Sequence, residues 1–162
     1  MDEELLARQV PQSLEAEQAV LGAIIIDPKS LNDIATQIKP EYFYIPQHRD
    51  IYTAMSSMFE LNQVIDFVSL LEKLKRDGVY DEAGGKAYIA KLVDSVPSAA
   101  NVLTHVAIMR ERYYARSLME AAKGIIHDIN ENVLDSGKLL DSAEQRIYEI
   151  REGREISGLT HI

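Results

Sequence analysis

The chain has 162 residues, of which 46% are hydrophobic and 27% charged, and its formal net charge is −9. This composition is typical of a globular domain, and the lack of Cys excludes disulfides and thiolate metal sites. The acidic excess argues against the chain as a main nucleic-acid-binding surface, because polyanions gain affinity through Lys and Arg contacts.

The first residues, Met-Asp-Glu-Glu-Leu-Leu-Ala-Arg, are acidic and contain no apolar segment of the kind that a secretory signal needs. The longest apolar run covers residues 19–26, which is far short of the about 20 residues that span a membrane. Together these features predict a soluble intracellular protein.

The hydrophobic pattern is helical nearly throughout, and the alternating runs that indicate strands are absent. We therefore predict an all-α fold that begins with a helical globular subdomain over residues 1–97. The first two expected helices cover residues 14–26, after a cap at Ser13, and residues 28–38. A third runs from Pro46 to the loop at 62–63. A fourth runs from a cap at Asp66 to Asp77, and a fifth follows Gly84-Gly85. The expected core residues include Leu14, Val20, Leu21, Ile24, Ile25, Ile51, Tyr52, Met55, Met58, Phe59, Phe67, Leu70, Leu71, Leu74, Tyr88, Ile89, Leu92 and Val93.

The segment Ser-Val-Pro-Ser-Ala-Ala-Asn, residues 95–101, separates this subdomain from the rest of the chain. Pro97 disfavours helix at the preceding residue, and Ser98 can cap the helix that follows. We expect one uninterrupted helix over residues 99–131, about 50 Å long, and a second over 136–152 that ends at Gly153. The two helices form a predicted hairpin over residues 98–153.

Two apolar stripes follow the first hairpin helix, and one follows the second. The main stripe is expected to meet the second helix, and the shorter one to dock on the globular part. The main stripe is Leu103, Ala107, Tyr114, Leu118, Ala121, Ile125 and Ile129, its counterpart is Leu139, Leu140, Ala143, Ile147 and Ile150, and the shorter stripe is Val102, Val106, Met109 and Tyr113. A two-helix arm cannot bury all of this surface, so the remainder indicates a partner interface. The alternative is a hairpin folded back into one bundle.

No residue pattern supports catalysis. The pairs Gly85-Lys86 and Gly137-Lys138 lack both the earlier Gly and the following Ser or Thr of a phosphate-binding loop. The four His residues are far apart, and His48 near Asp50 is better explained by a surface or capping role than by acid–base chemistry. Glu15 and Glu17 fit the helix dipole. The cluster Arg110, Arg112 and Arg116 is either a solvated helix face or a weak phosphate contact.

Four segments, taken together and in order, closely resemble the N-terminal domain of the bacterial replicative hexameric DNA helicase of the DnaB type. They are PQSLEAEQAVLGAIIIDP at 11–28, HRDIYTAM at 48–55, GGKAYIAKL at 84–92 and VPSAANV at 96–102. The resemblance covers about residues 9–153. It implies that residues 154–162 begin a linker toward a motor domain, which would hold the ATP and Mg²⁺ of the whole protein, with no cofactor in this part.

The resemblance also implies function. Hairpins of neighbouring subunits would pair, three such dimers would form a collar on the motor ring, and primase would dock on the collar through its C-terminal domain. A helicase loader is a further partner that the resemblance implies. The domain would contact DNA only as part of the full ring. The expected location is the bacterial cytoplasm. The expected self-association residues are Leu118, Met119, Ala122, Ile125, Ile126 and Ile129, and the expected primase contacts are Tyr88, Met119 and Ile125.

Two alternatives remain at this stage. The helicase-binding C-terminal domain of primase has a related architecture of globule and hairpin, although the segments EAEQAVLG and SAAN favour the helicase side. A generic helical adaptor module is the other alternative.

Overall fold

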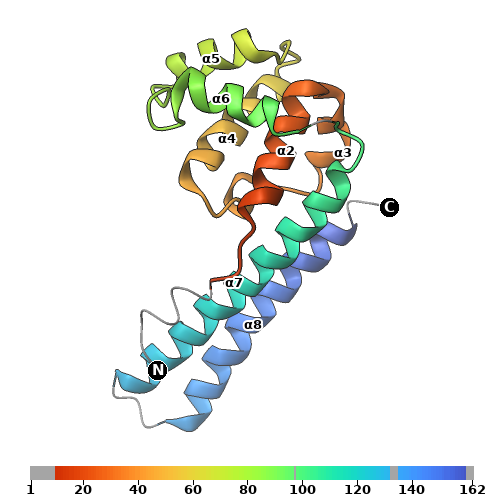
Figure 1. Cartoon of the computed structure of the whole chain (residues 1–162). Helices are drawn as coiled ribbons and strands as arrows, with labels where there is room; N and C mark the ends of the chain where they lie inside the picture. The colour runs from red at the N-terminus through yellow and green to blue at the C-terminus, as the bar shows by residue number, and fades with distance from the viewer. Residues whose placement is uncertain (1–9, 97, 132–134, 160–162) are drawn as a thin grey trace. The chain divides into compact units, whose positions relative to one another are not determined.

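The computed structural model describes residues 10–96, 98–131 and 135–159, and every regular element among them is a helix (Figure 1). This confirms the predicted all-α fold. The chain divides into two compact units. We call residues 13–110 the globular unit, and residues 111–162 together with 1–12 the hairpin unit. Helix α7, Val102–Asn130, contributes its first residues to the globular unit and the rest to the hairpin unit.

Helix α2, Leu14–Ile26, is the centre of the globular unit and contacts α4, Pro46–Glu60, and α6, Gly85–Asp94. As predicted, Ser13 caps it, because the Ser13 hydroxyl accepts a hydrogen bond from the Ala16 amide at 3.2 Å. Gly22 allows close packing on α6, since a Cβ atom there would lie 2.4 Å from the carbonyl oxygen of Leu92. Leu14 was expected in the core but is 46% exposed, because it lies on the first, outer turn.

The helix predicted over residues 28–38 is wrong in its extent. The structure has a 3-10 turn at Pro28–Ser30 and a short α3 at Leu31–Ile34. Polar side chains explain the early end, because the Thr36 hydroxyl and the Gln37 amide both donate to the Asp33 carbonyl, at 3.4 and 3.2 Å. Such local bonds compete with the helical pattern.

The remaining helices of the globular unit follow the prediction closely. A 3-10 turn at Pro40–Tyr42 leads to α4. Helix α5, Phe67–Arg76, starts at a capping box in which Asp66 accepts from the Ser69 amide at 2.8 Å and the Ser69 hydroxyl accepts from the Asp66 amide at 2.9 Å. These backbone bonds hold down the pKa of the exposed Asp66 carboxyl, Ser69 being the main cause.

Helix α7 begins three residues later than predicted. Its first backbone bonds run from the amides of Thr104 and His105 to the carbonyl of Asn101, so Asn101 takes the capping position. The Ser98 hydroxyl instead accepts from the Ala100 amide at 3.0 Å within the preceding turn. Pro97, which was expected to stop the previous helix, lies outside the described residues.

Helix α8, Ser136–Leu159, starts where Asp135 caps it, with the carboxylate accepting from the Lys138 amide at 3.2 Å. It continues through Gly153, where it was predicted to end. An isolated Gly costs a helix about 1 kcal/mol but ends it only when the backbone turns left-handed, and Gly153 stays helical. Residues 132–134 of the expected turn and 160–162 of the expected linker lie outside the described part.

Candidate functional site

Helices α7 and α8 run side by side and antiparallel (Figure 1), and the seam between them contains a polar cluster. Asp128 on α7 accepts hydrogen bonds from the Ser142 hydroxyl at 3.0 Å and from the Arg146 guanidinium at 3.3 Å. Arg146 also fills the space above Gly124, where a Cβ atom would lie 2.3 Å from its Nη1. Ser142 first, and then Arg146, lower the pKa of the Asp128 carboxyl.

This seam corrects the expected pairing of apolar stripes. Tyr114 and Ala121 are buried as predicted, but Leu118, Ile129, Leu140 and Ile147 are exposed. Leu103 is also 46% exposed. The small Gly124 and the polar Asp128 lie on the side of α7 that meets α8, so the seam follows these residues and turns the expected stripe partly outward. Three residues of the shorter stripe agree with the prediction, because Val102, Val106 and Met109 are buried in the globular unit.

Apart from Ile126, the large exposed aliphatic side chains in the hairpin unit lie on one side of the two helices. In each helix they directly follow a residue of the seam, as Ile125 follows Gly124, Ile129 follows Asp128 and Ile147 follows Arg146. One step along a right-handed helix turns a side chain by about 100°. Because the helices are antiparallel and face each other, this rotation places the side chains that follow seam residues on the same side of the hairpin in both helices. We call this surface the hairpin face; it comprises Leu118, Ala122, Ile125, Ile129, Leu140 and Ile147.

The hairpin face contains four of the six residues predicted to mediate self-association. The other two, Met119 and Ile126, lie further round α7 and away from α8. Large aliphatic side chains in this region are well exposed, between 42% and 62%: Leu118, Ile126, Ile129, Leu140 and Ile147. Ala122 is exposed, and Met119 and Ile125 are partly buried. Leu140 and Ile147 were missed as surface residues because the sequence pattern assigned them to the seam.

A second cluster lies inside the globular unit and consists of polar groups. Glu17 of α2 is 1% exposed and His48 of α4 is fully buried, so the expected surface role of His48 is wrong. The Glu17 carboxylate lies 2.8 Å from Nδ1 of His48 and accepts from the amides of Tyr44 and Ile45, at 2.9 and 3.3 Å. On its other side, Nε2 of His48 lies 2.5 Å from the hydroxyl of Tyr88 on α6.

The sequence contains a signal for this cluster in the position of Glu17 on α2. Glu17 precedes Val20 by three residues, Leu21 by four and Ile24 by seven, so it shares the buried side of α2 with them. A carboxylate at such a position requires hydrogen-bond donors around it, because a buried polar group without them is costly. The helix-dipole explanation was therefore incomplete for Glu17.

Two of the three candidate phosphate-binding arginines have backbone partners within the hairpin unit. The guanidinium of Arg112 donates to the Gln12 carbonyl and that of Arg116 to the Pro11 carbonyl, both at 2.9 Å. Arg110 belongs to the globular unit, and its Nε is buried with no hydrogen-bond partner among the described residues. These contacts fasten residues 11–12 to α7, and phosphate binding by the three arginines stays a prediction.

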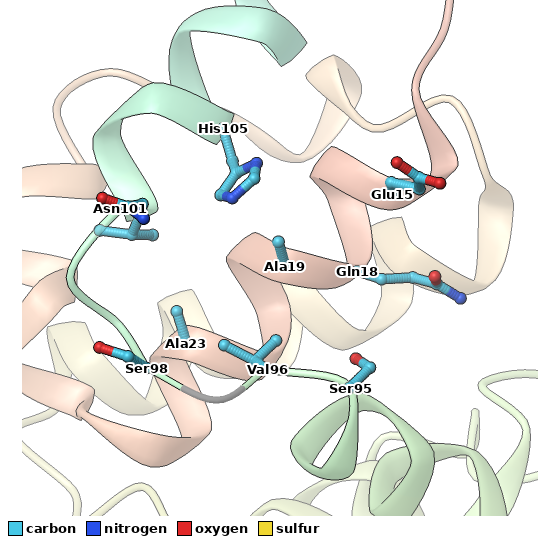
Figure 2. Close-up of a pocket in the computed structure, with 10 residues that line it drawn as sticks. Glu15, Gln18, Ala19, Ala23, Ser95, Val96, Ser98, Asn101 and His105 are labelled. Atoms are coloured by element: carbon cyan, nitrogen blue, oxygen red, sulfur yellow. The ribbon is translucent and has the colours of Figure 1, made fainter.

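A surface pocket of about 380 Å³ opens in the globular unit between α2 and residues 95–105. Figure 2 shows Ala19 and Ala23 in the middle of its lining, with polar side chains such as Glu15, Asn101 and His105 around them. Among the described residues, no three His, Asp or Glu side chains gather as a metal site would require. None of the described helices combines the length and apolar character needed to cross a bilayer.

Comparisons with known proteins agree with the fold. Residues 9–111 match the family model of the DnaB-like helicase N terminal domain. The replicative DNA helicase DnaB of Geobacillus stearothermophilus is 34% identical over 162 residues, all of this chain and 36% of that protein. The chain therefore spans about a third of the length of this relative.

Two solved structures are also similar. The N-terminal domain of DnaB helicase from Mycobacterium tuberculosis superposes with a TM-score of 0.82 at 30% identity, covering 87% of this chain and 99% of that one. A DnaB-like replicative helicase, studied with its interactions with primase, superposes with a TM-score of 0.69 at 28% identity over 85% of this chain and 31% of that one. The family match rules out the alternative of a primase C-terminal domain.

Proposed function

Because the chain belongs to the family of DnaB-like helicase N-terminal domains, we propose that it is the collar domain of a replicative DNA helicase and acts by association. In this proposal the hairpin unit pairs with the hairpin unit of a neighbouring subunit. Three such pairs complete a hexamer, and the C-terminal domain of primase docks on the collar.

The hairpin face is the observation that carries the self-association half of this proposal. Its aliphatic side chains lie on one side of two helices, and those of Leu118, Ile129 and Leu140 are at least 50% exposed. Contiguous apolar surface of this kind usually marks an interface, because covering it removes apolar area from water. The polar seam leaves the face without a partner within the described part of the chain.

Primase docking is supported by kinship and by the position of three residues. A similar DnaB-like helicase has been studied with its interactions with primase. Tyr88 is partly exposed on the globular unit, while Met119 and Ile125 are partly exposed on the hairpin unit. We assign these three side chains to primase contacts, with Ile125 shared between docking and self-association.

The other expected properties belong to the whole helicase. ATP and Mg²⁺ would bind its motor domain, single-stranded DNA would pass through its ring, and a loader would place the ring on DNA. Activity in the cytoplasm, at the replisome, follows from the same proposal.

Multi-angle light scattering of this domain, alone and with a primase C-terminal domain, tests the proposal. We expect a mass above that of the monomer for the domain alone, and a heavier complex when primase is added. Met119→Asp should weaken primase binding, whereas Val68→Asp, an equally apolar-to-acidic change at an exposed position of α5, should not. A strict monomer at high concentration that also fails to bind primase would contradict both halves.

A further inference from the structure

The buried polar cluster of the globular unit forms one continuous chain of hydrogen bonds that ends at two partly exposed residues, Tyr88 and Gln18. It runs from the backbone amides of Tyr44 and Ile45 through Glu17 and His48 to the hydroxyl of Tyr88. Gln18 of α2 then donates from its side-chain amide to the Tyr88 oxygen at 3.2 Å. Glu17 and His48 are the two buried polar or charged side chains of the described part of the chain, and neither is explained by self-association.

The direction of each bond in this chain follows from what its groups can donate. Glu17 as a carboxylate can only accept, so the nearby Nδ1 of His48 must carry a proton and donate it. In a neutral imidazole the other nitrogen is then a bare acceptor. Nε2 of His48 therefore accepts, and the Tyr88 hydroxyl is the donor that it accepts from.

A doubly protonated His48 would fit the surroundings less well. Nε2 would then donate to the Tyr88 oxygen, which already accepts from Gln18. The hydroxyl hydrogen of Tyr88 would then have no acceptor among the described residues, whereas His48 accepts it in the neutral form. The neutral form gives every group in the chain a suitable partner.

The position of the Tyr88 ring is fixed as firmly as its hydroxyl. The ring stacks on His48 with centroids 5.8 Å apart and an interplanar angle of 20°. The backbone of Gly84, with φ of +94°, also comes so close that a Cβ atom there would lie 2.6 Å from the Tyr88 Cβ. His48 and Gly84 together restrict the side-chain rotation of Tyr88.

We propose that Glu17 and His48 are positioning residues that fix the hydroxyl of Tyr88, a partly exposed residue, as a hydrogen-bond acceptor. Its only hydrogen points inward to His48, so a partner that meets the hydroxyl from outside must bring a donor. The proposal rests on the proposed function, in which Tyr88 contacts the primase C-terminal domain. It adds that the primase group at this point is a hydrogen-bond donor, such as an amide, an ammonium or a guanidinium.

Nitrogen NMR of the histidine-labelled domain tests the direction of the chain without any partner. His105→Gln, His127→Gln and His161→Gln variants identify the His48 signals by elimination. We expect a proton on Nδ1 of His48 and none on Nε2. In Tyr88→Phe the proton should stay on Nδ1, because Glu17 is unchanged, while the Nε2 signal shifts as its donor is lost. A proton on Nε2 would overturn the proposal, whether it belongs to the neutral Nε2–H tautomer or to the charged ring.

Titration with the primase C-terminal domain tests the role of the hydroxyl. Tyr88→Phe keeps the ring and removes only the hydroxyl, so we expect affinity to fall about 2- to 10-fold, the range for one hydrogen bond. Tyr148→Phe, at a 55% exposed position of α8, is the control for loss of a tyrosine hydroxyl and should leave affinity unchanged. Equal binding by Tyr88→Phe and wild type would overturn the docking role. If the wild-type domain does not bind at all, the proposed function fails, and the NMR result still decides the direction of the hydroxyl.

Discussion

Helix α2 and the hairpin part of α7 are both rich in aliphatic residues, but the structure treats them in opposite ways. Along α2, Val20, Leu21 and Ile24 are fully buried against neighbouring helices. Along α7, Leu118, Ile126 and Ile129 are all at least 50% exposed. The difference lies in what surrounds each helix, since α2 is enclosed by the globular unit, whereas this part of α7 has one partner helix. Aliphatic content alone therefore does not tell core from interface.

The polar groups differ between the units as well. In the globular unit they form a buried chain through Glu17 and His48 that connects α2, α4 and α6. In the hairpin unit Asp128, Ser142 and Arg146 occupy the seam itself. A hairpin that had to be stable alone would place its Leu and Ile side chains there. Using polar and small residues in the seam leaves the aliphatic ones for another molecule.

The largest expected effect separates the two regions by stability. Leu21→Ala should lower the free energy of unfolding by about 2–5 kcal/mol, because Leu21 is fully buried and its loss leaves a cavity. Leu118→Ala should change it by no more than about 0.5 kcal/mol, since half of that side chain is already exposed. Urea unfolding of dilute protein, followed by circular dichroism, measures both. Similar losses of unfolding free energy for the two variants would contradict the assignment of Leu21 to the core and Leu118 to the surface.

The next effect concerns a polar group in the packed core. Burial raises the pKa of Tyr52 from 10.0 to about 12. The unfolded state thus loses this proton first, and stability should fall by up to about 1.4 kcal/mol per pH unit between about pH 10 and 12.

Tyr52→Phe should remove this alkaline loss and cost about 1 kcal/mol at neutral pH, because the Ile38 carbonyl loses the hydroxyl that donates to it at 2.9 Å. Urea unfolding at pH 8 and pH 11 compares the variant with wild type. Parallel losses at pH 11 would show that Tyr52 is not the group responsible.

The smallest effect is expected in the hairpin seam. The pKa of Asp128 is lowered by the Ser142 and Arg146 contacts, so its contribution to stability is present above the ordinary value of 3.8 and is lost as pH falls further. Wild type should therefore lose more stability below about pH 4 than Asp128→Asn, which keeps the shape but not the charge. Thermal melts from pH 6 to pH 2.5 measure this difference, and Asp141→Asn, at an exposed position of α8, should behave like wild type.

Sequence patterns predicted the elements well and the contacts between distant residues poorly. The predicted caps at Ser13 and Asp66 depend on neighbours within three residues and were confirmed. Glu17 and His48 are 31 positions apart in the sequence, and the pattern of residues around Glu17 does not indicate that His48 is its partner. The seam was missed because a stripe ranked by hydrophobicity cannot show that Gly124 makes room for Arg146.

The central claim is that the hairpin face is an interface, and sedimentation equilibrium of Ile129→Asp tests it most directly. Ile129 is 54% exposed, so the charge should leave the monomer folded, which circular dichroism can verify. The matched control is Val68→Asp, at a position 67% exposed on the globular unit. We predict that wild type and Val68→Asp self-associate with the same dissociation constant and that Ile129→Asp stays monomeric over the same concentrations. Self-association of Ile129→Asp as strong as that of wild type would contradict the account.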